Sequence, residues 1–383
     1  MTFDYFSRLP MRRTVRFTGV GLVLFFVASS LPEVWSKTPH NPAQPPPQSS
    51  GHRKPAPSKL ETYQHREDAQ QLAAELAQQL SAQGLDPKWV KHSVLKAHKL
   101  PEVIRLVTPA PASVPKNWAV YRSRFIEPKR IQAGVKFWQA YAADLTRAEA
   151  QTGVPAEIVV GVIGVETIYG QHKGNFRVLD ALVTLSLDFP SSHPRQAERQ
   201  AFFKSELAQL LTFKRHGVNP LTLKGSYAGA MGWPQFMPSS WNRFAVDFDG
   251  DGRIDLLNSP VDAIGSVAHY LKAFGWQTGM PTHYAVSFDT ATLQLDELMV
   301  PDILPTFSVA SFMAKGAIPD ATGMTHNGPL ALIELQNGAS PASYVAGTEN
   351  FYVITRYNWS SYYAMAVIEL GRAVAQKAGA HAR

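Results

Sequence analysis

A strongly apolar segment between residues 155 and 170 restricts the fold of this chain more than any other feature. It places Ile-Val-Val-Gly-Val-Ile-Gly-Val between Glu157 and Glu166, a pattern that predicts a strongly apolar helix. An ionised carboxylate is costly in such surroundings, so burial would raise the pKa of Glu166 and keep it protonated near neutral pH. Such an acid can donate a proton to a leaving glycosidic oxygen. Taken alone, the segment is better explained as a structural helix, in which Glu166 makes an ordinary hydrogen bond, than as a helix that carries a catalytic acid.

Helical patterns also dominate the rest of the chain. Apolar residues at helical spacing predict further helices over residues 61–84, 131–152, 201–213, 259–275 and 360–378. Strand-like patterns are scarce, and the best pair for a short hairpin is 330–336 with 350–356. We therefore expect a mainly α fold, of the α+β kind, with a small β element.

The N-terminus has the pattern of an export signal. Four arginines precede an apolar run from Phe17 to Leu31, which is shorter than the roughly 20 residues of a full membrane span. We predict a signal peptide in residues 1–36, with an uncleaved signal anchor as the alternative. Residues 37–58 are rich in proline, serine and glutamine, which predicts an extended linker. A single globular region is then expected over 59–383.

Charge and cysteine content narrow the classes of partner and chemistry. The formal net charge of +7 favours acidic partners, among which nucleic acid, an anionic membrane and the bacterial wall all qualify. No basic cluster with interleaved aromatic residues supports nucleic acid, which is therefore not expected. The chain has no cysteine, which excludes disulfides, thiolate metal sites, cysteine nucleophiles and a lipid-modified N-terminal cysteine. No HExxH or GxSxG pattern indicates zinc or serine hydrolysis.

Residues 225–238 predict a shaped loop with the composition of a sugar-binding wall. Three glycines and two prolines prevent a regular element, and the small residues allow a ligand to approach the backbone closely. Aromatic side chains offer apolar faces, while Ser226 and Gln235 offer hydrogen bonds. The alternative is a packed structural loop.

Four stretches of the chain, taken in order, resemble the B-type membrane-bound lytic murein transglycosylases. They read GVPAEIVVGVIGVETIYG, GSYAGAMGWPQFMPSSW, DFDGDGRIDLLNSPVDAIGSVAHYL and FYVITRYNWSSYYAMAV. This family is glycoside hydrolase family 103 of the lysozyme-like superfamily, and the resemblance covers roughly residues 60–375. It implies a lysozyme-like catalytic core at about 150–280 with an additional helical domain. It also implies a periplasmic protein, with anchoring in the inner membrane if the N-terminal segment is retained.

The resemblance implies a set of functional residues. Glu166 matches the family's single catalytic acid. The positions matching the substrate groove are Ser226, Gln235, Tyr270, Tyr357, Asn358, Tyr363, Tyr121 and Arg199. For the aromatic positions, packing in the core is the alternative. The family's adjacent arginine pair is separated here, with Arg199 in the better register, so recognition of the peptide or acetyl portion of the substrate is expected to differ.

A second motif resembles the start of a calcium-binding EF-hand loop. Its ligand positions fall on Asp247, Asp249, Asp251 and Arg253, the last through its backbone carbonyl, with Gly252 at the sharp turn. Position 12 is Asn258 rather than a bidentate glutamate. The family closes an unusually long loop with a later aspartate, which implies Asp262 here. We expect a structural calcium ion, with an acidic turn that caps a helix as the alternative.

The resemblance implies cleavage of the β-1,4 bond between N-acetylmuramic acid and N-acetylglucosamine in peptidoglycan, with a 1,6-anhydromuramic product. One glutamate would serve as both acid and base, and no cofactor would be required for the chemistry. The expected partner is the glycan strand, and wall-synthesis proteins are further candidates. The alternatives are a hydrolytic lysozyme and a non-catalytic peptidoglycan-binding scaffold.

Overall fold

The computed structural model describes residues 61–108 and 115–379. The predicted signal segment at 1–36 and the predicted linker at 37–58 lie outside the described residues. Within the described ranges, none of the helices combines the length and apolar character needed to cross a membrane.

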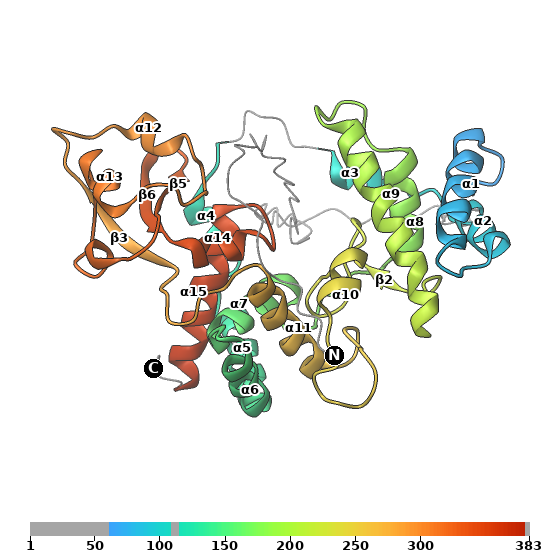
Figure 1. The fold of residues 1–383 in the computed structure, drawn as a ribbon, viewed down its shortest axis with the longest axis horizontal. Helices are drawn as coiled ribbons and strands as arrows, with labels where there is room; N and C mark the ends of the chain where they lie inside the picture. The colour runs from blue at the N-terminus through green and yellow to red at the C-terminus, as the bar shows by residue number, and fades with distance from the viewer. Residues whose placement is uncertain (1–60, 109–114, 380–383) are drawn as a thin grey trace, which may run out of the picture.

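The described chain is mainly helical, as predicted (Figure 1). The α-helices are α1 (Glu67–Ser81), α2 (Pro87–Leu95), α3 (Pro101–Val107), α4 (Trp118–Ser123), α5 (Pro128–Ala140), α6 (Ala142–Thr152), α7 (Ala156–Thr167), α8 (Val178–Leu187), α9 (Gln196–Thr212), α10 (Pro238–Phe244), α11 (Pro260–Ala273), α12 (Leu295–Met299), α13 (Val309–Ala314), α14 (Glu349–Thr355) and α15 (Ser361–Ala378). Two 3₁₀ turns are η1 (Phe213–His216) and η2 (Gly323–Thr325). The single helix expected over 131–152 is divided into α5 and α6 at Tyr141.

Two small antiparallel sheets complete the fold. One pairs β1 (Phe176–Arg177) with β2 (Lys224–Gly225). The other has the order β4-β3-β6-β5 and consists of β3 (His283–Phe288), β4 (Ala317–Pro319), β5 (Ala331–Asn337) and β6 (Ser340–Gly347). It has its own small apolar core, formed by Tyr284, Leu298, Phe312, Ala317, Leu330, Leu332 and Ala346.

The predicted hairpin was right in its first strand and wrong in its second. β5 pairs with β6, whereas residues 350–356 fall mostly in helix α14. The hydroxyl of Thr348 accepts a hydrogen bond from the amide of Asn350 at 3.2 Å and so caps the helix start. The Asn337-Gly338 turn, with φ of 64° at Gly338, is the local signal that closes the real hairpin.

Helix α7 lies at the centre of a group of helices that also contains α5, α6, α11 and α15 (Figure 1). Its backbone touches that of α15 directly. A Cβ atom on Gly161 would collide with the carbonyl oxygen of Val367, and one on Gly371 would collide with the carbonyl oxygen of Glu157. This contact between backbones fixes the relative position of the side chains that the two helices present at their ends.

Candidate active site

Glu166 lies in the last turn of α7, where the buried helix meets a pocket. Its Oε1 accepts a hydrogen bond of 2.6 Å from the hydroxyl of Tyr363 on α15. Burial raises the pKa of Glu166 from 4.5 to about 7, and the Tyr363 hydrogen bond opposes that rise. The carboxyl group can therefore both give up and take a proton near neutral pH, as the sequence predicted.

The chain reverses sharply just after Glu166. Ile168, Tyr169 and Gly170 all have left-handed backbones, with φ of 51°, 55° and 80°. This conformation is strained for a β-branched residue such as Ile168. A Cβ atom on Gly170 would lie 2.6 Å from the ring of Trp233, so glycine is needed for that ring to pack there. The reversal therefore joins the end of α7 to the loop at 225–238.

The pocket beside Glu166 has an empty volume of about 560 Å³, including its space open to solvent. Four of the predicted site residues line it, namely Glu166, Gln235, Tyr270 and Tyr357. The remaining lining residues are Phe202, Glu206, Phe236, Met237, Ser239, Ser240 and Arg356. Aromatic rings and polar groups thus share one wall, which is the combination that binds sugar rings.

Gln235 is held in a fixed orientation within this pocket. Its backbone is left-handed, with φ of 50°. Its side-chain amide donates to the carbonyl oxygens of Gly232 at 2.9 Å and Lys173 at 3.2 Å. Because both amide hydrogens are used, the side-chain oxygen remains to accept a hydrogen bond from a ligand.

The pocket tyrosines are anchored through their hydroxyl groups. Tyr357 donates to the carbonyl oxygen of Pro234 at 2.5 Å, and Tyr270 donates to that of Arg356 at 2.7 Å. Tyr357 also stacks on Tyr363, with ring centroids 6.3 Å apart and an angle of 14° between the rings. These hydroxyls position the rings.

The other predicted groove residues lie outside the lining of this pocket. Tyr121 packs against Phe125 and Tyr362. Burial raises the pKa of its hydroxyl, and the charge of Glu166 adds to that rise. Ser226 uses its side-chain oxygen to accept from the amides of two nearby alanines. Asn358 is buried next to Tyr357. Arg199 is buried in the first turn of α9.

Glu206 on α9 is a pocket residue that the sequence did not reveal. Its two carboxylate oxygens accept from the hydroxyl of Ser239 at 2.6 Å and from the amide of Ser239 at 2.9 Å. Burial raises its pKa, and the Ser239 hydrogen bonds oppose the rise. The start of α10 thus occupies both oxygens of this second acid.

Comparison with known proteins identifies the family. The sequence model described as the transglycosylase SLT domain matches residues 68–372, which is most of the chain. The chain belongs to this lytic transglycosylase family. The resemblance detected in the sequence is confirmed, and so is the lysozyme-like fold class.

Relatives of this transglycosylase cover most of its length. Membrane-bound lytic murein transglycosylase B of Escherichia coli (strain K12) is 43% identical over 302 residues, which are 76% of this chain and 79% of the relative. The Escherichia coli lytic transglycosylase Slt35, solved in complex with calcium, is 39% identical, with a TM-score of 0.70, covering 82% of this chain and 95% of that one. SltB3 of Pseudomonas aeruginosa, solved in complex with NAG-anhNAM-pentapeptide, is 29% identical, with a TM-score of 0.65, covering 79% and 78%.

In this transglycosylase, the acidic loop brings three carboxylates together. Asp247, Asp249 and Asp251 each offer an oxygen within 4.8 Å of the others, and all three side chains are exposed. These hard oxygen donors suit calcium. The predicted closing residue, Asp262, is buried instead, and its oxygens accept from the backbone amides of Phe248, Asp249 and Asp255. Asp262 thus holds the shape of the loop.

At the calcium-like position 7 of this loop, Arg253 is exposed and its backbone amide donates to Asp251 at 2.8 Å. Asn258, at position 12, donates from its side chain to Asp255 at 2.9 Å. The loop is therefore closed by contacts within the protein, and its three clustered carboxylates are exposed while they accept hydrogen bonds from the loop's own amides.

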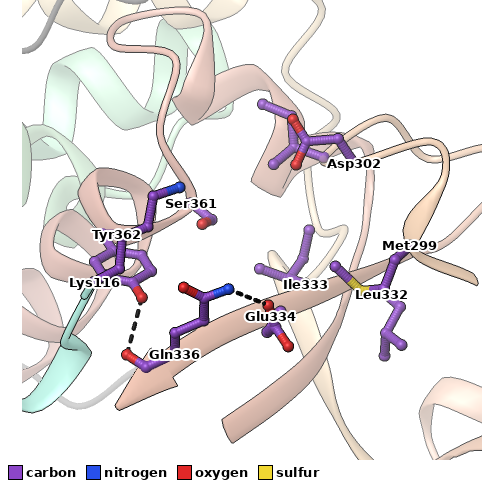
Figure 2. A pocket seen from close by; sticks show the side chains of 10 residues that line it. Lys116, Met299, Asp302, Leu332, Ile333, Glu334, Gln336, Ser361 and Tyr362 are labelled. Atoms are coloured by element: carbon purple, nitrogen blue, oxygen red, sulfur yellow. Dashed lines mark hydrogen bonds between the residues drawn. The ribbon is translucent and has the colours of Figure 1, made fainter. Parts of the chain in front are cut away.

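A second pocket of the transglycosylase does not include Glu166 (Figure 2). It lies between the end of β5 and the start of α15, and its lining includes Lys116, Asp302, Glu334, Gln336 and Tyr362. The side-chain amide of Gln336 donates to Glu334 at 2.8 Å, and the Tyr362 hydroxyl donates to the Gln336 carbonyl at 2.9 Å, as Figure 2 shows. Of these two pockets, only the first is lined by Glu166.

Proposed function

We propose that this chain is a lytic murein transglycosylase that uses Glu166 as its single acid and base. It cleaves the β-1,4 bond between N-acetylmuramic acid and N-acetylglucosamine, and its product carries a 1,6-anhydromuramic end. The observation that carries the proposal is Glu166 itself, which is surrounded by apolar helix, has a pKa of about 7 and faces the pocket. The name of the Escherichia coli relative, a murein transglycosylase, and the ligand of SltB3 agree with this substrate class.

In the first step, the protonated Glu166 gives its proton to the glycosidic oxygen as the bond to the muramic C1 breaks. The N-acetylglucosamine part leaves with a free hydroxyl. Positive charge develops at C1 and is stabilised by the acetamido group of the muramic residue. Glu166 is left ionised, and the hydroxyl of Tyr363, which lies 2.6 Å away, stabilises that carboxylate.

In the second step, the Glu166 carboxylate takes the proton of the muramic C6 hydroxyl. The C6 oxygen attacks C1 and closes the anhydro ring, and Glu166 is protonated again. No water enters the product. A hydrolytic lysozyme would need water to attack C1 instead. The one other carboxylate that lines this pocket, Glu206, has both oxygens hydrogen-bonded to Ser239, which supports the reaction without a second acid.

The acidic loop would hold a structural calcium ion through Asp247, Asp249 and Asp251. When bound, the ion would neutralise the repulsion among these carboxylates and stabilise the loop before α11. Slt35, which was solved in complex with calcium, supports this assignment. The roles of the Arg253 carbonyl and of Asp262 as further ligands remain predictions.

Export to the periplasm through residues 1–36, with the inner-membrane anchor as the alternative, also belongs to this proposal. The glycan strand is the partner that the pocket supports, and wall-synthesis proteins remain predicted partners.

The test is to incubate the purified protein and a Glu166→Gln variant with isolated peptidoglycan and to identify the released fragments by mass spectrometry. We expect anhydromuramyl fragments from the wild-type protein alone. Fragments with reducing muramic ends would make the protein a lysozyme. If neither protein releases fragments although both are folded and still bind the wall, the protein would be a binding scaffold.

A further inference from the structure

Arg130, in the first turn of α5, is a buried cation without a carboxylate partner among the described residues. Its side chain belongs to a residue that is only 7% exposed, and no ion pair within 4 Å involves it across the described ranges. The nearby carboxylate of Glu127 accepts instead from the backbone amides at the start of α5. A buried charge is costly unless other groups compensate it, so the position of this guanidinium requires a cause.

The compensation comes from the helix that carries Glu166. One terminal nitrogen of Arg130 donates to the carbonyl oxygen of Gly164 at 2.7 Å and contacts that of Val165 at 3.4 Å. The other donates to the carbonyl oxygen of Arg124 at 3.3 Å. The guanidinium also lies over the ring of Phe125, 5.1 Å from its centroid. Arg130 is thus bound mainly to the two residues that precede Glu166.

The carbonyl of Val165 lacks its helical donor because of the reversal at the end of α7, whereas that of Gly164 still accepts from the amide of Ile168 at 3.2 Å. In a continued helix, the amide of Tyr169 would bind the carbonyl of Val165. Here it bonds back to Ile163 at 3.4 Å, because residues 168–170 are left-handed. The last turn would then hold an uncompensated carbonyl at the negative end of the helix. Arg130 supplies a positive charge at this end, a 3.4 Å contact to the carbonyl of Val165 and a second, shorter hydrogen bond to that of Gly164.

We infer that Arg130 is a positioning residue for Glu166, which fixes the last turn of α7 and favours the ionised carboxylate that forms between the two steps. Arg130 touches neither the pocket lining nor the Glu166 side chain in the structure, so it acts through the backbone and its charge. The inference rests on the proposed function, because it assigns Glu166 the roles of acid and base.

Other titratable groups surround Glu166 and set the background for this effect. They are Tyr363 on α15, Tyr121 on α4, Tyr270 on α11, Tyr357 before α15 and, around the pocket, Glu206 and Arg356. The tyrosines are neutral near pH 7, because burial raises the pKa of each. A change at Arg130 therefore acts on Glu166 without a competing titration from them.

The experiment compares Arg130→Met and Arg130→Lys with wild type, by kcat, KM and the pH dependence of kcat on isolated glycan strands. In Arg130→Met we expect kcat to fall by about tenfold. The basic limb of the pH profile, which is the fall of kcat at high pH, should move up by about half a pH unit to one unit. KM should stay within about twofold, since the pocket wall is unchanged. Arg130→Lys, which keeps the charge, should leave the limb near its wild-type position and restore part of kcat.

Arg147→Met is a control for the loss of an arginine away from α7; unlike Arg130, Arg147 is exposed and forms an ion pair with Asp144 at 2.8 Å. Arg147 also lies over an aromatic ring, 3.8 Å from the centroid of Phe248, and donates to a backbone carbonyl, that of Phe248 at 2.7 Å. It does so at the acidic loop and not at α7. This variant should therefore have the kcat of the wild type and the same basic limb in its pH profile.

The outcomes separate this inference from the proposed function. A wild type that releases no anhydromuramyl product overturns the proposed function. An active wild type with a folded Arg130→Met variant that shares its pH limb and kcat overturns the role of Arg130. Far-ultraviolet circular dichroism reports folding, and if Arg130→Met does not fold, Arg130→Gln, which also removes the charge, takes its place with the same expected shift. A lysine variant as impaired as methionine in limb and kcat, while folded, would also overturn the role of charge.

Discussion

Two acids line the same pocket, and their surroundings differ in one decisive respect. Glu166 and Glu206 are both glutamates whose pKa is raised by burial. Glu166 has one oxygen bound by the Tyr363 hydroxyl, whereas Glu206 has both oxygens bound by Ser239. Burial alone therefore does not distinguish a catalyst from a structural residue. The distinction lies in whether an oxygen remains to exchange a proton with a ligand.

The two acids also belong to different kinds of helix end. Glu166 is in the last turn of its helix, where the helix dipole opposes a negative charge and keeps the proton on the acid. Glu206 instead accepts from the first turn of α10, where a negative charge is favoured. One helix end thus supports a reactive acid, and the other neutralises a fixed carboxylate.

The largest expected effect is a difference in kcat between variants of the two acids. Glu166→Gln should lower kcat by about 10³-fold, because glutamine can neither donate nor accept the proton. Glu206→Gln should change kcat by less than about threefold, although it should lower the unfolding temperature because one of the two Ser239 donors loses its acceptor. Rates of glycan release with thermal unfolding of both variants test this. Similar losses of kcat in two folded variants would show that the pair acts together.

The second prediction concerns stability and pH. The pKa of Glu166 rises from 4.5 to about 7 in the folded protein, so the folded state holds its proton more tightly than the unfolded state. The stabilisation is complete below pH 4.5 and is lost as pH rises through about 7. Relative to wild type, Glu166→Gln should therefore gain up to about 3 kcal/mol in free energy of unfolding at pH 8. It should gain nothing comparable at pH 4.

Urea unfolding at the two pH values measures this gain. An equal change at both values would show that the substitution acts through packing and that Glu166 is not held protonated.

The third prediction tests the hydrogen bond from the tyrosine hydroxyl to Glu166, which has no counterpart at Glu206. Tyr363 donates to Glu166 and lowers its pKa, so Tyr363→Phe should raise that pKa and move the basic limb of kcat up by about one pH unit. Tyr357→Phe is the control, because its hydroxyl donates to Pro234. A limb that moves equally in both variants would assign the effect to the aromatic wall as a whole.

The smallest effect is expected at the acidic loop. Asp262 resembles Glu206, since both carboxylates are buried, whereas Asp247 and Asp251 are exposed and clustered. Calcium at about ten times its Kd should raise the free energy of unfolding by about 1 kcal/mol. The double variant Asp247→Asn/Asp251→Asn should lose this response and keep the wild-type kcat. Calorimetry with calcium and with chelator measures the stability response, and the rate of glycan release measures kcat. A calcium response that survives in the double variant would place the ion elsewhere.

Much of the site was predictable because its signals are local. The apolar run before Glu166 indicates a buried helix and an acid with a raised pKa, and the glycine-rich loop with Gln235 indicates a shaped wall. The positions of Tyr270 and Tyr357 came from the resemblance. The pocket brings these residues together, which no periodic pattern along the chain indicates.

Glu206 and Arg130 escaped prediction because their partners are distant in sequence. Each is a charged residue in a helical segment, and such residues are usually solvated. Glu206 binds Ser239, and Arg130 binds Gly164. The error over 350–356 has a similar origin: Val353 and Ile354 favour a strand locally, but the cap at Thr348 and burial against the helices favour α14.

The backbone contact between α7 and α15 has a consequence for the order in which Glu166 and its surroundings assemble. Glu166 and its partner Tyr363 are 197 residues apart in the chain. During synthesis, the acid emerges long before the tyrosine that binds it and the helix that covers α7. Until α15 docks on α7, the Glu166 carboxyl group lacks this hydrogen-bond partner, and α7 lacks the backbone contact at Gly161. Assembly of the pair is therefore coupled to a contact between distant parts of the chain.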